Sequence, residues 1–331
     1  MKTYSLSDPP LKVFGVPLFE KTGQLQRLPD SVIEKLPHLH KLAMRCPGGR
    51  IVFQTDSPYF TVRVVLKSLR VDIGMSIYSA QSARVTLGTG KNLRDIGIVN
   101  PPNYETLAFE QSFTKSAEME QVTVWFPRNE PIETIEISVE DSAAVAEPLP
   151  LRYEKPVVFY GSSITEGGCS CNTTCAYNAI LSQWLDFEYY NLGFSGNAKG
   201  EPEMAEFIST LDMGAFVFDY DHNAPTPEHL QATHQPFFQK IRQAHPTLPI
   251  LIMSRPAQIY TEEMIARRSV IKATYEAALA AGDRNVYFLD GETFYTDRDR
   301  HLCSIDDCHP NDLGFYRMAT AIRPVLEQML G

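Results

Sequence analysis

The sequence predicts a chain of two parts, in which an all-β sandwich or jelly roll precedes an α/β domain built on a doubly wound parallel sheet. The length of 331 residues suggests two domains, at about 150 residues per domain. Residues 1–145 contain short, partly alternating apolar stretches and no long helical period. From residue 156 onward, apolar strand-like stretches alternate with helical patterns, which is typical of a parallel sheet covered on both faces.

The first part, residues 1–150, reads as a series of short strands. Gly, Pro, Asn or Ser often separates them, and this punctuation favours a sandwich or jelly roll. A short helix is predicted around residues 30–36. The predicted strands are 51–55, 60–66, 71–78, 84–87, 121–126 and 135–139.

The predicted boundary is the small, proline-bearing segment 141–150, and the second domain takes residues 151–331. A flavodoxin-like strand order, 2-1-3-4-5, would bring the loops after the first and third strands together across a crevice. The predicted strands are 156–160, 187–192, 215–221, 249–254 and 286–290. The predicted helices are 173–185, 203–210, 227–244, 261–281 and 311–330.

Composition excludes several classes of partner. Apolar residues make up 44% of the chain, enough for a sizeable core, and the net charge of −10 argues against nucleic acid or an anionic membrane. No apolar run approaches the ~20 residues of a membrane span. The N-terminus lacks the apolar core of a signal peptide, which favours a cytoplasmic location, and an exported protein whose signal has been removed is the alternative. The sequence carries no signal for an oligomeric state.

Ser163 follows the apolar run 157–160 and Gly161, so a strand would deliver it to the carboxyl edge of the sheet. A serine there is a candidate nucleophile if a base reaches it. The alternative is that Ser163 only caps the helix that follows.

His309 is the candidate base, and Asp306, three residues earlier, can fold back to orient its ring. Asp307 is the alternative orienting carboxylate, and His301 is an alternative base. The chain order Ser, Asp, His also occurs in α/β-hydrolases, whose motif is Gly-x-Ser-x-Gly. Thr165 stands where the second glycine of that motif belongs, which disfavours that fold.

Two loops offer donors for an oxyanion. Gly196 follows the second strand of this domain and can present a backbone N–H, and Asn223 follows the third and can present its amide. Both could instead be turn residues only. His222, beside Asn223, is a candidate substrate contact, and Arg255, after the fourth strand, is either an anion-binding residue or a solvated loop residue.

Four marks in order resemble the SGNH, or GDSL-type, serine hydrolase superfamily over residues 156–331. They are the segment 161–165, Gly196, Asn223 and the pair Asp306-x-x-His309. The resemblance implies that Ser163 is the nucleophile, that its N–H joins Gly196 and Asn223 in the oxyanion hole, and that His309 and Asp306 complete the triad. Ser162 and Ala224 stand where the family often has aspartates, which affects the subfamily more than the mechanism.

The resemblance extends to a branch with an N-terminal jelly-roll domain that includes carbohydrate esterases. Together with the small or polar residues 165–168 beside the nucleophile, it favours a serine esterase that removes short acyl groups, above all acetyl, from a carbohydrate or another small polar ester. The alternatives are an acyltransferase with the same triad, a non-catalytic carbohydrate-binding protein and a metal-dependent hydrolase.

Five cysteines lie near the predicted site. Cys169, Cys171 and Cys175 follow Ser163, while Cys303 and Cys308 flank Asp306. They could hold zinc, form a disulfide that braces two loops, or fill the interior. The paired spacing of structural zinc sites is missing, and a serine mechanism needs neither metal nor cofactor, so none is expected.

Overall fold

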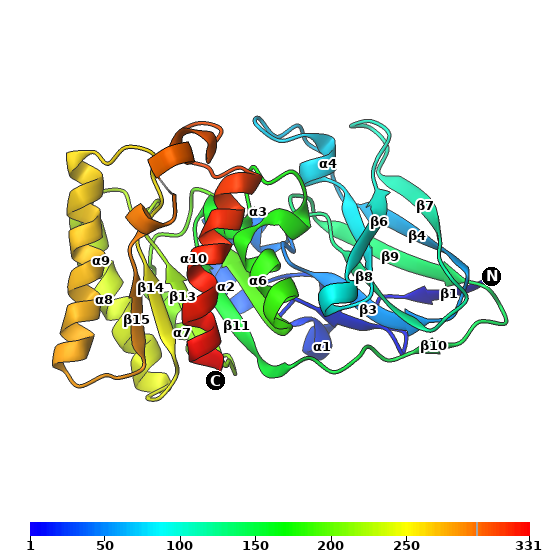
Figure 1. The fold of residues 1–331 in the computed structure, drawn as a ribbon, viewed down its shortest axis with the longest axis horizontal. Coiled ribbons are helices and arrows are strands. Elements are labelled where there is room, and N and C mark those ends of the chain that lie inside the picture. The colour runs from blue at the N-terminus through cyan, green and yellow to red at the C-terminus, as the bar shows by residue number, and fades with distance from the viewer. Residues whose placement is uncertain (296) are drawn as a thin grey trace. The chain divides into compact units, whose positions relative to one another are not determined.

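The computed structural model describes residues 1–295 and 297–331, which fold into two compact units (Figure 1). The first unit contains Met1–Pro29, Ala43–Arg152 and Cys171–Thr174. The second contains Asp30–Leu42, Tyr153–Ser170 and Cys175–Gly331. Most of the chain up to Arg152 therefore belongs to the first unit, and most of the chain after it belongs to the second. The exceptions are residues 30–42, which belong to the second unit, and residues 171–174, which belong to the first.

The first unit consists of two antiparallel sheets with a few short helices. One sheet has the order β1 (Lys2–Ser5), β9 (Ile132–Val139), β4 (Tyr59–Leu66), β7 (Ala108–Thr114). The other has the order β10 (Val145–Ala146), β3 (Arg50–Thr55), β8 (Glu120–Trp125), β5 (Ala83–Leu87), β6 (Arg94–Val99), and β2 (Lys12–Phe14) pairs with β3. The helices are α1 (Phe19–Thr22), α4 (Ile77–Ala80) and η2 (Gly90–Asn92).

Both sheets bury alternate residues in one hydrophobic core. Along β4, Phe60, Val62 and Val64 are fully buried, while the residues between them are partly exposed. Residues of β3, β5 and β8 belong to the same apolar cluster as residues of β4 and β9. Two sheets that share their inner faces in this way form a β-sandwich.

The strand predicted at 71–78 is wrong. Val71 and Ile73 are 69% and 99% exposed, Gly74 has φ of 87°, and the segment ends in α4. None of its residues is buried, and no strand among the described residues pairs with it. Conversely, β6 and β7 were not predicted from the sequence. Only Phe109 and Phe113 of the seven residues of β7 are buried, which is too few to show the alternation of a strand.

The second unit contains the predicted five-stranded parallel sheet, in the predicted order 2-1-3-4-5. The strands in spatial order are β12 (Phe187–Gly193), β11 (Tyr153–Gly161), β13 (Ala215–Asp219), β14 (Ile250–Met253) and β15 (Val286–Leu289). Gly161 pairs in register with Gly193 on one side and Asp219 on the other. The loops that follow these three strands therefore start at the same edge of the sheet.

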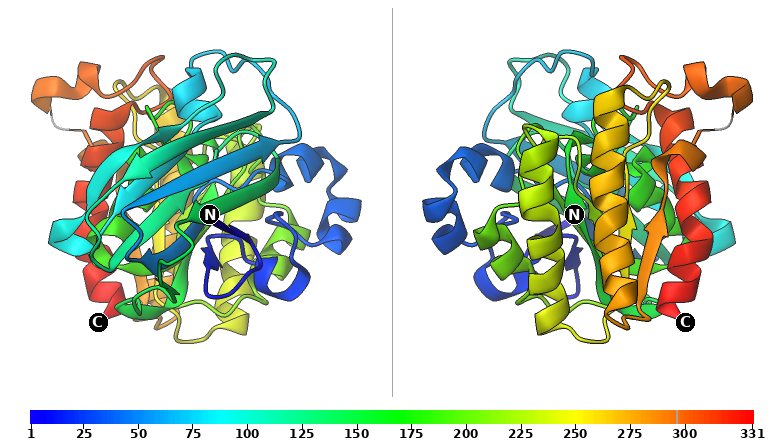
Figure 2. Two further views of the ribbon diagram at one scale, coloured as in Figure 1. Left: turned by 90° about the vertical axis from the view of Figure 1, so that its right-hand side faces the viewer. Right: turned by 90° about the vertical axis from the view of Figure 1, so that its left-hand side faces the viewer.

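Helices form two layers around this sheet. In one layer α8 packs against α7 and α9. In the other layer α6 packs against α10. Figure 2 shows α8 and α9 side by side. The bounds are α6 (Tyr177–Leu185), α7 (Pro202–Ile208), α8 (Pro227–Ala244), α9 (Glu262–Ala280) and α10 (Asp312–Leu330). The short elements are α2 (Asp30–Lys35), η1 (Pro37–Leu39), α3 (His40–Ala43), α5 (Ser163–Glu166), η3 (Thr173–Cys175), η4 (Gly291–Thr293) and η5 (Asp297–Leu302). Within the described ranges, no helix combines the length and apolarity needed to cross a bilayer.

Candidate active site

Ser163 is the first residue of α5, and only Ser162 separates it from the end of β11. The helix cap is Ser162, whose Oγ accepts a hydrogen bond from the Ile164 N–H at 3.2 Å, so Ser163 is not needed for capping. The tight turn depends on Gly161, since a Cβ there would lie 2.1 Å from Thr165 Oγ1 and 2.5 Å from the Asp219 carbonyl oxygen. The turn places the Ser163 hydroxyl at the carboxyl edge of the sheet.

The structure brings Ser163, His309 and Asp306 together in a continuous hydrogen-bonded chain. Ser163 Oγ lies 3.0 Å from His309 Nε2, and His309 Nδ1 lies 2.7 Å from Asp306 Oδ2. The other carboxylate oxygen, Asp306 Oδ1, accepts the backbone N–H of His309 at 2.7 Å and of Cys308 at 3.1 Å. A serine within reach of an imidazole that a carboxylate orients is the arrangement required for nucleophilic catalysis.

The Asp306 carboxyl is poised to stay ionised. Its partial burial raises the pKa, but the hydrogen bonds from the backbone and ring of His309 and from the Cys308 N–H outweigh burial and lower the pKa below its ordinary value. Asp307, the alternative orienter, has a left-handed backbone with φ of 64°, and its N–H donates to Ser304 Oγ at 3.1 Å. His301 is exposed on η5.

The two predicted oxyanion donors lie on loops that are joined by a hydrogen bond. Gly196, with φ of 70°, belongs to the loop after β12. Asn223 follows β13, and its Oδ1 accepts the N–H of Ala198 at 3.3 Å. This bond fixes the amide orientation and leaves Nδ2, which has no hydrogen-bond partner among the residues that the structure describes, as a donor.

A buried polar network beneath Ser163 was not predicted from the sequence. Asp219, the last residue of β13, is 1% exposed and accepts hydrogen bonds from Thr165 Oγ1 at 2.7 Å and from the Tyr177 hydroxyl at 3.0 Å. Burial raises the pKa of Asp219 to about 7, although both hydroxyls lower it. The signal in the sequence that could have indicated this network is Asp219, a carboxylate at the end of the apolar stretch 215–218.

Glu166 holds the loop that carries Gly196. It is 2% exposed, and its Oε2 accepts hydrogen bonds from both the N–H, at 2.8 Å, and the hydroxyl of Ser195. Thr165 and Glu166 therefore turn inward, and their interpretation as small or polar surroundings of the acyl group is wrong. Of the residues 165–168 that favoured a short acyl group, only Gly167 and Gly168 still support it.

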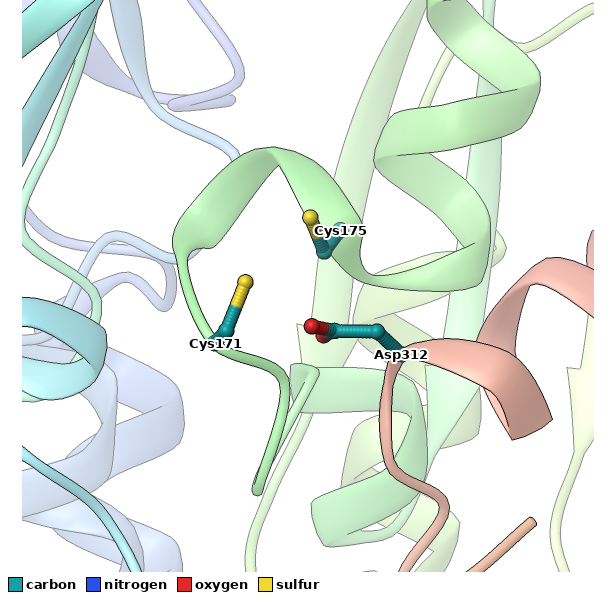
Figure 3. Close-up of side chains that lie close together, drawn as sticks. All are labelled: Cys171, Cys175 and Asp312. Atoms are coloured by element: carbon teal, nitrogen blue, oxygen red, sulfur yellow. The ribbon is translucent and has the colours of Figure 1, made fainter. Parts of the chain in front are cut away.

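The cysteines do not enter the hydrogen-bonded chain of Ser163, His309 and Asp306. Cys303 and Cys308 are free thiols, so they do not form a disulfide that would brace the Asp306 loop. Cys171, Cys175 and Asp312 each offer one ligand atom, and these atoms lie within 4.8 Å of one another (Figure 3). None of these three residues provides a group that the serine mechanism requires.

Comparisons with known proteins show the family of the second unit and the fold. The model of the GDSL-like lipase/acylhydrolase family matches residues 154–327. A search of curated proteins found no match to this sequence.

Three solved structures show the fold. A structure from Bacteroides ovatus ATCC 8483 described as a GDSL-like lipase has a TM-score of 0.88 at 24% identity, over 99% of this chain and 98% of that one. A salicylyl-acyltransferase from a tetracycline biosynthetic pathway has a TM-score of 0.80 at 20% identity, over 99% and 97%. An acetyl xylan esterase from the rumen bacterium Butyrivibrio proteoclasticus has a TM-score of 0.63 at 12% identity, over 100% of both chains.

Proposed function

The chain belongs to the GDSL-like lipase/acylhydrolase family and is an SGNH-type esterase, and we propose that it removes short acyl groups, above all acetyl, from a polar alcohol such as a carbohydrate. The observation that carries the proposal is the hydrogen-bonded chain from Ser163 through His309 to Asp306. A family match over residues 154–327 covers all three of these residues.

In the proposed mechanism, Ser163 Oγ attacks the ester carbonyl while His309 Nε2 takes its proton. Asp306 keeps the proton on His309 Nδ1 and stabilises the imidazolium that forms. The alcohol leaves with the proton from Nε2, and an acyl group remains on Ser163. A water molecule then gives its proton to Nε2 and attacks the acyl-enzyme, which releases the carboxylic acid and restores Ser163.

The proposed oxyanion hole consists of the Ser163 N–H, the Gly196 N–H and Asn223 Nδ2. The expected effect of Asn223→Ala is a ~10²–10³-fold fall in kcat with little change in KM, because the amide would stabilise only the tetrahedral intermediate. Steady-state kinetics on one acetyl ester measure both constants. A raised KM with an unaltered kcat would make Asn223 a ground-state substrate contact instead.

The short acyl group is supported by the likeness to an acetyl xylan esterase and by the glycines at 167 and 168 beside the nucleophile. We expect kcat/KM on esters of one alcohol to fall steeply as the acyl chain lengthens from two carbons toward eight. Acetylated sugars should release acetate in the same assay, and Ser163→Ala is the control for background hydrolysis. A rate that climbs with chain length would reject the short-acyl proposal.

An acyltransferase with the same triad is the second candidate, favoured by the likeness to the salicylyl-acyltransferase over nearly the whole of both chains. In that case an alcohol rather than water would intercept the acyl group on Ser163. Product analysis with a competing alcohol separates the two. Transfer that dominates over hydrolysis in excess water would favour the transferase.

A further inference from the structure

Four polar side-chain atoms on the loops after β13, β14 and β15 are buried without a hydrogen-bond partner among the described residues. One of them, Asp221 Oδ1, has the Arg267 guanidinium 3.9 Å away. The other three are His222 Nε2, Arg255 Nε and Tyr295 Oη. These residues follow β13, β14 and β15, which are neighbours in the sheet. A buried polar group without a partner destabilises the fold, so these three on adjacent loops point to a ligand that completes their hydrogen bonds.

Hydrogen bonds tie these loops to one another. The Arg255 backbone N–H donates to Asp221 Oδ2 at 3.2 Å, which links the loops after β14 and β13. His222 Nδ1 lies 3.7 Å from Cys308 Sγ, which links the loop after β13 to the residue beside His309. His222 also directly precedes Asn223. His222 Nε2 and Arg255 Nε therefore lie on joined loops next to the proposed oxyanion donor and the proposed base. Tyr295 lies close enough to Cys308 for that group to raise its pKa.

Burial determines the protonation of these groups. Burial and the nearby charge of Arg255 hold the pKa of His222 well below its ordinary value, so its ring is neutral. Burial raises the pKa of the Cys308 thiol despite the nearby charge of Arg255, so the S–H remains. When this S–H donates to His222 Nδ1, 3.7 Å away, the ring proton is on Nε2, which is then a donor. Burial also raises the pKa of Tyr295, which keeps its O–H.

Arg255 differs from Arg267, the other arginine near Asp221. Arg267 is committed to the fold, because it pairs with Glu263 at 2.8 Å and donates to the Asp221 carbonyl at 3.2 Å. The Nε of Arg255 makes no such bond within the described part of the chain. The Arg255 guanidinium therefore still has an unpaired donor, and His222 and Tyr295 on the adjacent loops are neutral polar groups. Together they suit a ligand that has a negative charge and acceptor oxygens.

We propose that Arg255, together with His222 and Tyr295, binds a carboxylate of the ester substrate. The inference rests on the proposed esterase function and adds a substrate class to it: esters that carry a second, ionised carboxyl group. That carboxylate can belong to the alcohol portion, as in an acetylated hydroxy acid, or to the acyl portion, as in a dicarboxylic half-ester.

Two pairs of matched esters test the proposal and separate the two sources. One pair is 4-acetoxybenzoate and 4-acetoxybenzamide, and the other is monoethyl succinate and ethyl succinamate. The wild-type enzyme should have a higher kcat/KM for the carboxylate than for the amide in one pair, and that pair identifies the portion that binds. Arg255→Met should lower the carboxylate-to-amide ratio by ~10- to 100-fold, because it removes a charge-assisted hydrogen bond.

Arg323→Met is the matched control, since Arg323 lies on α10 and pairs with Glu327 at 3.0 Å. It removes the same charge and should leave the ratio at its wild-type value. Tyr295→Phe should lower the ratio by less than Arg255→Met. A wild-type enzyme without preference in either pair, or an Arg255→Met ratio equal to the wild-type ratio, would overturn the proposal.

A measurement on the wild-type protein covers the case in which Arg255→Met does not fold. 4-Hydroxybenzoate and 4-hydroxybenzamide, tested as competitive inhibitors of acetyl-ester hydrolysis, differ only in the charged group. The benzoate should inhibit more strongly if the alcohol portion carries the carboxylate, and succinate should inhibit more strongly than succinamide if the acyl portion does. Equal inhibition in both pairs would overturn the proposal. Failure to hydrolyse any of the four esters would instead contradict the esterase function.

Discussion

The two segments that form the Ser163–His309 pair are held in place in different ways. The nucleophile turn, residues 161–168, has most of its side chains buried, whereas the base loop, residues 303–311, leaves the Asp306 and His309 side chains 46% and 29% exposed. The turn is fixed by contacts with distant parts of the sequence, and the loop mainly by hydrogen bonds within itself. Changes in the turn should therefore alter stability as well as activity, and changes in the loop mainly activity.

The nucleophile turn is held by side chains from three other elements. The Thr165 carbonyl accepts a hydrogen bond from Asn178 of α6 at 2.7 Å and another from Asn191 of β12 at 2.9 Å. The Thr165 hydroxyl donates to Asp219 of β13. Buried and fully bonded networks of this kind specify a single geometry, which suits a nucleophile that must not move.

The base loop depends on short-range bonds. The Ile305 N–H donates to the His309 carbonyl at 3.1 Å, and Asp306 accepts two backbone N–H groups of the same loop. The left-handed Asp307 allows the loop to fold back so that Asp306 reaches the ring. Gln258, which donates to Ser304 Oγ at 2.6 Å, is a contact from outside the loop.

The largest expected effect comes from removing either end of the Ser163–His309 pair. Ser163→Ala and His309→Ala should each lower kcat by up to ~10⁶, and the double variant should be no worse than either, because the two residues act as a unit. Single-turnover and steady-state assays on an acetyl ester measure this. Losses that simply multiply in the double variant would show that the turn and the loop act separately.

A smaller effect separates the two carboxylates of the base loop. Asp306→Asn should cost up to ~10⁴ in kcat, because the amide favours the wrong His309 tautomer. Asp307→Asn is the matched control and should change kcat little, since asparagine also tolerates the left-handed backbone. Thermal unfolding of both variants checks that the loop still folds. A larger loss from Asp307→Asn would identify Asp307 as the orienting carboxylate.

The smallest effect concerns stability and pH in the network beneath the nucleophile turn. The pKa of Asp219 is raised from its ordinary 3.8 to about 7, so between these values the folded protein holds a proton that the unfolded chain releases. The wild type therefore loses stability from this group as the pH rises through that window. Asp219→Asn does not titrate, so its Tm minus the wild-type Tm should increase from pH 4 to 8. A difference that stays constant or decreases would show that Asp219 is ionised throughout.

Much of the second unit could be predicted from its sequence, because long helical periods alternate there with wholly apolar strands such as β14. Ser163, Gly196 and Asn223 could be placed since each follows the end of a strand, and parallel strands end at one edge. The Thr165–Asp219–Tyr177 network could not, because it joins residues up to 54 positions apart whose partners depend on the fold. In the first unit, β7 was missed because it has too few buried residues to show a period.

Covalent capture of the nucleophile tests the central claim most directly. The wild-type protein, incubated with an aryl phosphonate that mimics the tetrahedral intermediate, should gain one adduct per chain, and peptide mass spectrometry should place it on Ser163. Ser163→Ala should gain none, and His309→Ala should react far more slowly, because the hydroxyl then lacks its base. Loss of esterase activity with the adduct on another residue, or undiminished labelling of Ser163→Ala, would contradict the account.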